Sequence, residues 1–373
     1  MTLQLIVNKQ DVAPLLSGPP KINDEIDSVC RTLEFQLQAA DGLTNYLGNA
    51  VQLYLGGKRW FYGFLEVTGW DANGVITYKA YDPLYFLKKN PYDYYCKNQT
   101  AKQIAAQVLS TVGIKAGILA DTKSVLAPKL YQKAEGDKVI IDVLARTYKT
   151  TSKKYWLRFN PEEGREFGAE IYERVVPRDL WAFQRGVNMT SAKFDESLEE
   201  HFNVVHLINR ETGKKVAKAD KQLALDYGVR THVEEVDKDK AATMERDAAA
   251  LLVEKKKVKT TINMEGMNLN LAMPQFYSGD VIYVEEEMTQ VFGAYHIRSV
   301  SQTIVDSKTI QLAFALQNAP DVPQIQFDDK QEQKKTKNKQ GKKDKNKKDK
   351  DKDGNGSPGT YSPEMQKVID KYM

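Results

Sequence analysis

Two distant stretches of the sequence follow the same pattern, and this repeat constrains the fold more than any other feature. Residues 51–81 and 281–315 each run as strand, polar connection, aromatic residue beside glycine, strand, turn and strand. Gly63 and Gly293 take matching places. A glycine inside a strand indicates a bulge or tight bend, which curls a small sheet towards a barrel. The repeat predicts two related β modules in one chain.

Period-two alternation supports the strand assignment of the first eighty residues. Leu33, Phe35 and Leu37 alternate with polar residues, as in a half-buried antiparallel strand. Turns are expected at Gly56-Gly57 and Asn73-Gly74. Three further strands are expected at residues 51–55, 60–67 and 75–81. The pattern predicts a meander that folds as a small barrel or sandwich.

The period changes near Asn98, where helices begin. Thr100 and Gln103 have the spacing of a capping box, and Gly113 supplies a helix end. Further elements are expected as a helix at about 138–147, strands at about 154–159 and 170–174, and a longer amphipathic helix at about 238–257. The middle of the chain is therefore predicted to be α+β, with the long helix packed on a sheet.

Charge is concentrated at one place in the sequence. Residues 330–353 hold twelve lysines and five acidic residues, so this segment contributes +7 to a net charge of +4 and the remainder carries −3. The segment lacks aromatic and aliphatic residues, which is typical of a disordered charged linker at 328–360. Residues 361–373 are expected to form a short terminal peptide that could be one helix. A solvated spacer and a nucleic-acid-binding segment are both open readings of the linker.

Several classes of protein have no support in the sequence. Cys30 and Cys96 are too few for a disulfide framework, which fits assembly in a reducing cytoplasm. No apolar run reaches the roughly 18 residues of a membrane span, and the start of the chain does not resemble a signal peptide. We therefore expect no membrane insertion.

No catalytic, cofactor-binding or metal-binding residue is assigned from the sequence. His201 and His206 are expected on opposite faces of one strand, and His232 and His296 stand apart, so no metal site is predicted. Glu199 with Glu200, and residues 285–287, could serve as glycosidase carboxylates, but adjacent exposed acids are usually solvated charge. Asp349, Asp351, Asp353 and Gly354 match the opening of a calcium loop, but Thr360 replaces its final acid, which favours chance.

Four separated segments resemble a known family when taken in order. They read ITYKAYDPLYFLKKN, YCKNQTAKQIAAQVLSTVGI, GDVIYV and FGAYHIRSVSQTI. Together they resemble the baseplate hub proteins of PBSX-like and related contractile tails, relatives of the late control protein D family. The resemblance covers about residues 1–325. It implies a β-rich α+β fold with two tube-like antiparallel β-barrel modules. The expected domains are 1–88 and 191–327 for the modules, the second including the long helix, and 89–190 for the α+β middle domain.

The resemblance also implies a function. Such hubs are structural proteins without enzymatic activity, in which a homotrimeric ring adapts a sixfold tail tube to a threefold central spike. The implied partners are the tail tube protein, the central spike protein, the tape-measure protein and baseplate wedge or LysM-like tail proteins. DNA would pass the lumen without specific binding. The implied location is the baseplate of a virion or tail particle assembled in the bacterial cytoplasm.

Two other functions remain open at this point. A tail-associated peptidoglycan-degrading enzyme would need a pair of positioned carboxylates. An adaptor that binds nucleic acid or another partner would depend on residues 330–353.

Overall fold

The computed structural model describes residues 3–39, 46–164, 166–237 and 242–318. The chain forms two compact units. The first contains the described residues up to 195 and those from 260 onward, and the second contains residues 196–259. The residues that match a calcium loop, the lysine-rich segment and the terminal peptide lie outside the described residues.

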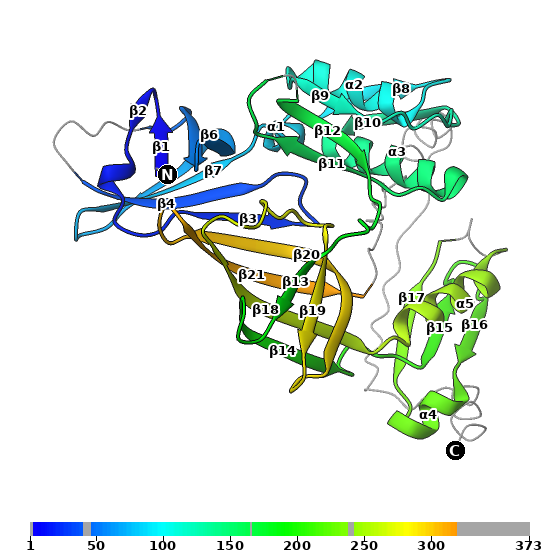
Figure 1. The fold of residues 1–373 in the computed structure, drawn as a ribbon. Coiled ribbons are helices and arrows are strands. Elements are labelled where there is room, and N and C mark those ends of the chain that lie inside the picture. Colours follow the sequence, from blue (N-terminus) through cyan, green and yellow to red (C-terminus); the bar gives the residue numbers. More distant parts are fainter. Residues whose placement is uncertain (1–2, 40–45, 165, 238–241, 319–373) are drawn as a thin grey trace, which may run out of the picture. The chain divides into compact units, whose positions relative to one another are not determined.

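The first unit is built on one large hydrogen-bonded sheet (Figure 1). Its strands are β1 Leu3–Val7, β2 Gln10–Asp11, β3 Lys21–Glu25, β4 Thr32–Gln38, β5 Ala50–Leu55, β6 Lys58–Trp70, β7 Val75–Tyr81, β13 Trp181–Gln184, β14 Met189–Ser197, β18 Lys259–Leu269, β19 Val281–Glu286, β20 Val291–Ile304 and β21 Thr309–Gln317. A short 3-10 helix, η1 Ala13–Leu15, follows β2.

The strand order joins segments that are far apart in the chain. The sheet reads β14, β18, β21, β20, β3, β4, β7, β6, β5, β1 and β2, and β19 pairs with both β20 and β13. The pairs β5–β6, β6–β7, β19–β20 and β20–β21 are antiparallel. The two meanders predicted from the repeat are therefore confirmed.

A single apolar cluster lies beneath both meanders. Its buried members include Phe35 of β4, Tyr78 of β7, Phe183 of β13 and Phe314 of β21. The rings of Phe35 and Tyr78 stack with centroids 5.3 Å apart, and those of Phe183 and Phe314 meet edge to face at 5.3 Å. Burial of each such ring contributes roughly 1.5–3 kcal/mol, so both parts of the chain stabilise one core.

An α+β region lies between the two meanders in the chain and belongs to the same unit. Its elements are α1 Tyr85–Lys89, β8 Tyr92–Cys96, α2 Ala101–Val112, β9 Ala116–Leu119, β10 Lys129–Ala134, α3 Gly136–Thr151, β11 Tyr155–Asn160 and β12 Gly168–Glu173. The strands β11, β12 and β9 form one small sheet, and β10 pairs with β8.

The helix signals read from the sequence are confirmed in α2. The Thr100 side chain accepts from the backbone N–H of Gln103, and the Gln103 side chain accepts from that of Thr100, which completes the capping box. Gly113 ends the helix in the left-handed conformation with a φ of 75°. The second predicted helix is present as α3 and is longer than expected.

The second unit has a small core of its own. Its elements are β15 Val204–Ile208, β16 Lys215–Ala219, α4 Lys221–Tyr227, β17 Thr231–Glu235 and α5 Met244–Lys255. Met244 and Ala248 of α5 are buried against Val205, Leu207 and Val216 of its sheet. The long helix was expected inside the second β module, but α5 belongs to this separate unit because its apolar side is covered by β15 and β16.

The β-rich α+β fold class is confirmed. The boundaries of the two tube-like modules stay a prediction. The strand β13, which pairs with β19, begins at Trp181, before the expected start of the second module at residue 191. Among the described residues, no helix is both long and apolar enough to cross a membrane. Cys30 and Cys96 are both buried and free, and burial raises the pKa of the Cys30 thiol to about 11.

Gly63 provides a test of the close packing in β6. A Cβ at this position would lie 2.2 Å from the carbonyl oxygen of Tyr81, whereas a Cβ at Gly69 in the same strand would meet nothing within 4 Å. Gly63→Ala is therefore expected to lower the free energy of unfolding by roughly 1–3 kcal/mol. Gly69→Ala, the matched control, should stay within about 0.5 kcal/mol of wild type. Urea denaturation of both variants checks this, and equal stabilities would contradict it.

Candidate functional site

Two parts of the large sheet share one strand order. The first reads β3, β4, β7, β6 and β5 across the sheet, and the second reads β14, β18, β21, β20 and β19. In chain order, both arrange their five strands as first, second, fifth, fourth and third. We call the first set of strands the first module and the second set the second module. The repeat seen in the sequence therefore extends to five strands in each module.

Each module closes onto its long strand through the same turn. The tetrapeptides YLGN and YSGD have Gly48 and Gly279 as their third residues. Gly48 N donates to the carbonyl oxygen of Leu65 at 2.7 Å, and Gly279 N donates to that of Ile297 at 2.6 Å. Both glycines have positive φ, 77° and 87°, where glycine is favoured. The turns therefore place Leu65 of β6 and Ile297 of β20 at equivalent positions. Gly63 then corresponds to Tyr295, so the predicted match between Gly63 and Gly293 was wrong.

The strands β3 and β20 join the two modules edge to edge, and we call this pairing the internal seam. Its antiparallel register places Asn23 opposite Ser301, and the Ser301 hydroxyl donates to Asn23 Oδ1 at 2.7 Å. On the side facing the core, Ile22 and Val300 are 0% and 2% exposed. The seam thus combines main-chain hydrogen bonds with a continuous apolar layer.

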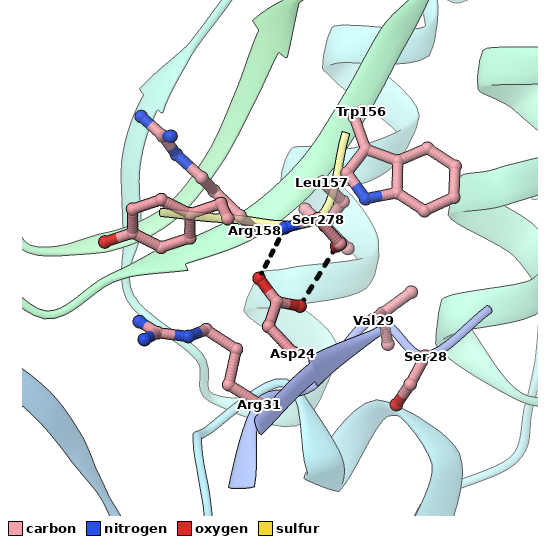
Figure 2. A pocket seen from close by; sticks show the side chains of 9 residues that line it. Asp24, Ser28, Val29, Arg31, Trp156, Leu157, Arg158 and Ser278 are labelled. Carbon is pink, nitrogen blue, oxygen red and sulfur yellow. Dashed lines mark hydrogen bonds between the residues drawn. The ribbon is translucent and has the colours of Figure 1, made fainter. Parts of the chain in front are cut away.

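A buried carboxylate lies beside the internal seam. Asp24 of β3 accepts hydrogen bonds from the backbone N–H and the hydroxyl of Ser278, both at 3.0 Å (Figure 2). Ser278 belongs to the YSGD turn of the second module, whereas Asp24 belongs to the first. Hydrogen bonds to a charged group contribute roughly 1.5–3 kcal/mol. Asp24 therefore fixes the turn of one module to the strand of the other.

Two arginines share one aromatic ring at this junction. The guanidinium carbons of Arg31 and Arg158 lie 4.6 Å and 4.7 Å from the centre of the Tyr277 ring. Arg158, on β11, also donates through Nε to Glu170 at 3.0 Å. Cation–π contacts of this kind contribute roughly 0.5–2 kcal/mol each. The stack connects the first module, the α+β region and the turn of the second module.

The space inside this junction is too small for a substrate. The cavity between Asp24, Arg31 and Arg158 has a volume of about 10 Å³ (Figure 2). This volume is roughly that of one water molecule, whereas ligand pockets usually measure about 300–1,000 Å³. The cluster therefore has the size and bonding of a structural junction.

Asp82 completes the buried cluster. Its carboxylate accepts from the backbone N–H groups of Arg31 at 2.9 Å and Leu84 at 3.0 Å. Burial raises the pKa of Asp82 to about 7, against the lowering effect of these two hydrogen bonds and of the Arg31 charge. The folded protein therefore holds a proton on Asp82 at pH values where the unfolded chain has released it.

Three of the acidic residues considered as glycosidase carboxylates, Glu200, Glu285 and Glu286, are engaged in other contacts. Glu286 accepts from the Thr289 backbone and hydroxyl, both at 2.6 Å, and these bonds lower the pKa of its carboxyl. Glu285 accepts from Gln184. Glu200 pairs with Lys259 at 2.9 Å, which lowers the pKa of Glu200. A general acid requires a raised pKa, so Glu286 and Glu200 do not have its electrostatics.

His201, His206 and His232 belong to the second unit, and His296 belongs to the first. His201 precedes β15 and is buried against the Tyr227 ring, so strand alternation does not apply to it, and the expectation that it shares a strand with His206 was wrong. His206 lies on β15, where burial lowers its pKa. In the part of the chain that the structure describes, no group of three His, Cys, Asp or Glu side chains is placed to hold a metal ion.

Sequence reasoning did not find the charged junction. Arg31, Arg158 and Tyr277 are distant in the chain and carry no local motif. A signal for the turn was available, because YLGN and YSGD extend the repeat upstream of residues 51 and 281.

The fold is that of phage tail proteins. The 43 kDa tail protein of prophage MuSo2 from Shewanella oneidensis superposes with a TM-score of 0.61, at 14% identity, covering 85% of this chain and 97% of that protein. The E. coli c3393 protein, described as a type VI secretion component similar in structure to the T4 tail proteins gp27 and gp5, gives a TM-score of 0.53 at 11% identity, covering 87% and 79%. By its fold, the chain therefore belongs with phage tail proteins.

The chain belongs to the YQBQ-like family, which matches residues 21–314. The phage-like element PBSX protein XkdQ of Bacillus subtilis strain 168 is 25% identical over 264 residues, which cover 68% of this chain and 78% of that protein. The chain is thus a structural component of a phage tail, of the baseplate type, and the resemblance read from the sequence is confirmed.

The buried Asp82 predicts an unusual dependence of stability on pH. Its folded pKa of about 7 lies above the ordinary value of 3.8. Between these two pH values the folded state binds the extra proton, so the free energy of unfolding should fall as pH rises, by up to about 1.4 kcal/mol per pH unit. Asp82→Asn should lose this component of the slope.

Urea denaturation of wild type and Asp82→Asn at several pH values between about 4 and 8 measures this slope. Asp179→Asn, which removes an exposed carboxylate, is the matched control. The same slope in Asp82→Asn as in wild type would contradict the assignment.

Proposed function

We propose that this chain is the baseplate hub of a contractile tail, in which three copies form a ring that adapts a sixfold tail tube to a threefold central spike. The ring contributes structure and alignment, and it carries out no reaction. This is a more specific role than membership of the family requires.

The observation that supports the proposal is the presence of two equivalent modules in one chain. Both modules arrange five strands in the same order, and the internal seam already joins them side by side. Three copies would therefore present six similar modules to the tube and three identical chains to the spike. A chain with one module, or with three, would not provide this match.

Ring closure also accounts for the edges of the sheet. A heterologous interface repeated around an axis generates a closed ring when the rotation closes. The unpaired edge of a long strand otherwise exposes hydrogen-bonding groups that favour aggregation. A ring in which every edge is paired removes this liability.

The charge of the chain outside the lysine-rich segment suits a channel. Outside residues 330–353 the chain has a formal charge of −3. A channel wall with this charge attracts DNA weakly, because binding to phosphates depends on clustered Lys and Arg. We infer that DNA passes the lumen without specific binding.

The proposed partners follow from this position in a tail. They are the tail tube protein above, the central spike protein below, the tape-measure protein in the lumen, and baseplate wedge or LysM-like tail proteins at the outside. Assembly would take place in the bacterial cytoplasm, which agrees with the two buried, free cysteines.

The mass of the purified chain in solution tests the hub. Light scattering at low and moderate salt should give about three times 42.3 kDa. The same number of copies is expected after removal of residues 330–373, because the described strands lie within residues 3–318. Negative-stain images should show threefold rings. A stable dimer, or a monomer at every concentration, would contradict the proposal.

A further inference from the structure

We propose that β14 of one protomer pairs with the free end of β6 of the next protomer, repeating between chains the pairing that β3 and β20 make within one chain. This inference rests on the proposed ring and names the strands that would close it. The partner is therefore a second copy of this chain.

The strand equivalence identifies the two edges. The first strand of the first module, β3, pairs on one side with β4 and on the other with β20 of the second module. The first strand of the second module, β14, pairs with β18 and is the end strand of the sheet as described. Since β14 corresponds to β3, the unpaired edge of β14 corresponds to the edge of β3 that pairs with β20. The equivalent of β20 is β6.

The strand β6 has an unpaired edge at the position where β20 pairs with β3. Both β6 and β20 are long strands with a register shift, which falls between Leu65 and Val67 in β6 and between Ile297 and Ser299 in β20. Beyond the shift, β20 pairs with β21 on one edge and β3 on the other. Beyond its own shift, β6 pairs with β7, and no other described strand lies on its second edge.

Each of these edges carries an aromatic side chain that is exposed on the face that should be covered. Trp70 lies opposite the buried Ile76 on β7, so it belongs to the core face, yet it is 61% exposed. Phe194 lies two residues from Ala192, which packs against the core, so it shares that face, yet it is 40% exposed.

The internal seam shows what such residues do when their edge is paired. Counted from the equivalent Ile297 and Leu65, Gln302 takes the place in β20 that Trp70 takes in β6. Gln302 lies opposite Ile22 of β3, and both are 0% exposed. Pairing β14 with β6 would bury Trp70 and Phe194 in the same way and continue the apolar layer from one protomer into the next. Exposed aromatic side chains at an unpaired edge are otherwise unfavourable in an isolated chain.

Cysteine cross-linking tests the pairing directly. Gly69 has room for a side chain, since a Cβ there meets nothing within 4 Å, and it alternates with the core-facing Trp70. Gly69→Cys is combined in turn with Ser191→Cys, Lys193→Cys or Asp195→Cys. These three positions alternate with Ala192 and Phe194, so they lie on the outward face of β14 and report the register.

The control combines Gly69→Cys with Lys102→Cys, an exposed position on α2. Mild oxidation should link at least one β14 pair into a ladder of multimers at least tenfold more efficiently than the control. Equal cross-linking in all four variants, or none in any, would overturn the pairing.

A second variant measures the same interface without new thiols. Trp70→Glu places a charge in the layer and is expected to raise the dissociation constant of the assembly at least tenfold, with the melting temperature of the isolated chain unchanged. Val175→Glu, at another exposed apolar residue, is the matched control and should assemble as wild type does. Unchanged assembly of Trp70→Glu would count against the pairing.

The outcomes distinguish the β14–β6 pairing from the hub proposal. If light scattering gives a trimer but no β14 cross-link forms, the hub proposal stands and the β14–β6 pairing is wrong. If specific cross-links form in an assembly of another size, the pairing stands and the trimer is wrong. A chain that neither assembles nor cross-links contradicts both proposals.

Discussion

The main-chain hydrogen bonds between β3 and β20 are the interaction on which the rest of the first unit depends. They connect residues near the start of the chain with residues near the end of its described part, so the two modules share one sheet and one apolar core. The α+β region, which lies between the modules in the chain, contacts both of them, through Pro161 at Arg59 and through Arg158 at Tyr277. Loss of this pairing would expose Ile22 and Val300 and two strand edges at once.

The charged cluster makes the pairing specific. A main-chain ladder alone can slip in register, whereas Asp24 accepts two hydrogen bonds from Ser278 in only one register. Arg31 and Arg158 over the Tyr277 ring add a third segment of chain to the same point. Buried charges need such partners, because removing one partner leaves the other charge uncompensated. The cluster thus selects one arrangement of three segments.

Local signals in the sequence identify local structure well, whereas features that depend on distant contacts could not be read in this way. Period-two alternation locates β4, and the pair Thr100 and Gln103 locates the start of α2, because the determining contacts lie within a few residues. The amphipathic pattern of α5 indicates a helix but does not say which sheet covers it. Nothing local marks Arg158 as a partner of Tyr277. The strand β3 reads KINDE, with Ile22 as its one apolar residue, so its sequence does not mark it as a partner of β20, and only the arrangement in three dimensions decides that they pair.

The second unit interrupts only one of the two modules. In the first module, β3 is followed by β4 after residues 26–31, whereas in the second module the corresponding strands are separated by the whole of residues 198–258. The insertion distinguishes two otherwise similar building blocks. A ring assembled from whole chains therefore has two modules for every inserted unit. A neighbouring protein that contacts the modules meets twice as many similar surfaces as one that contacts the inserted units.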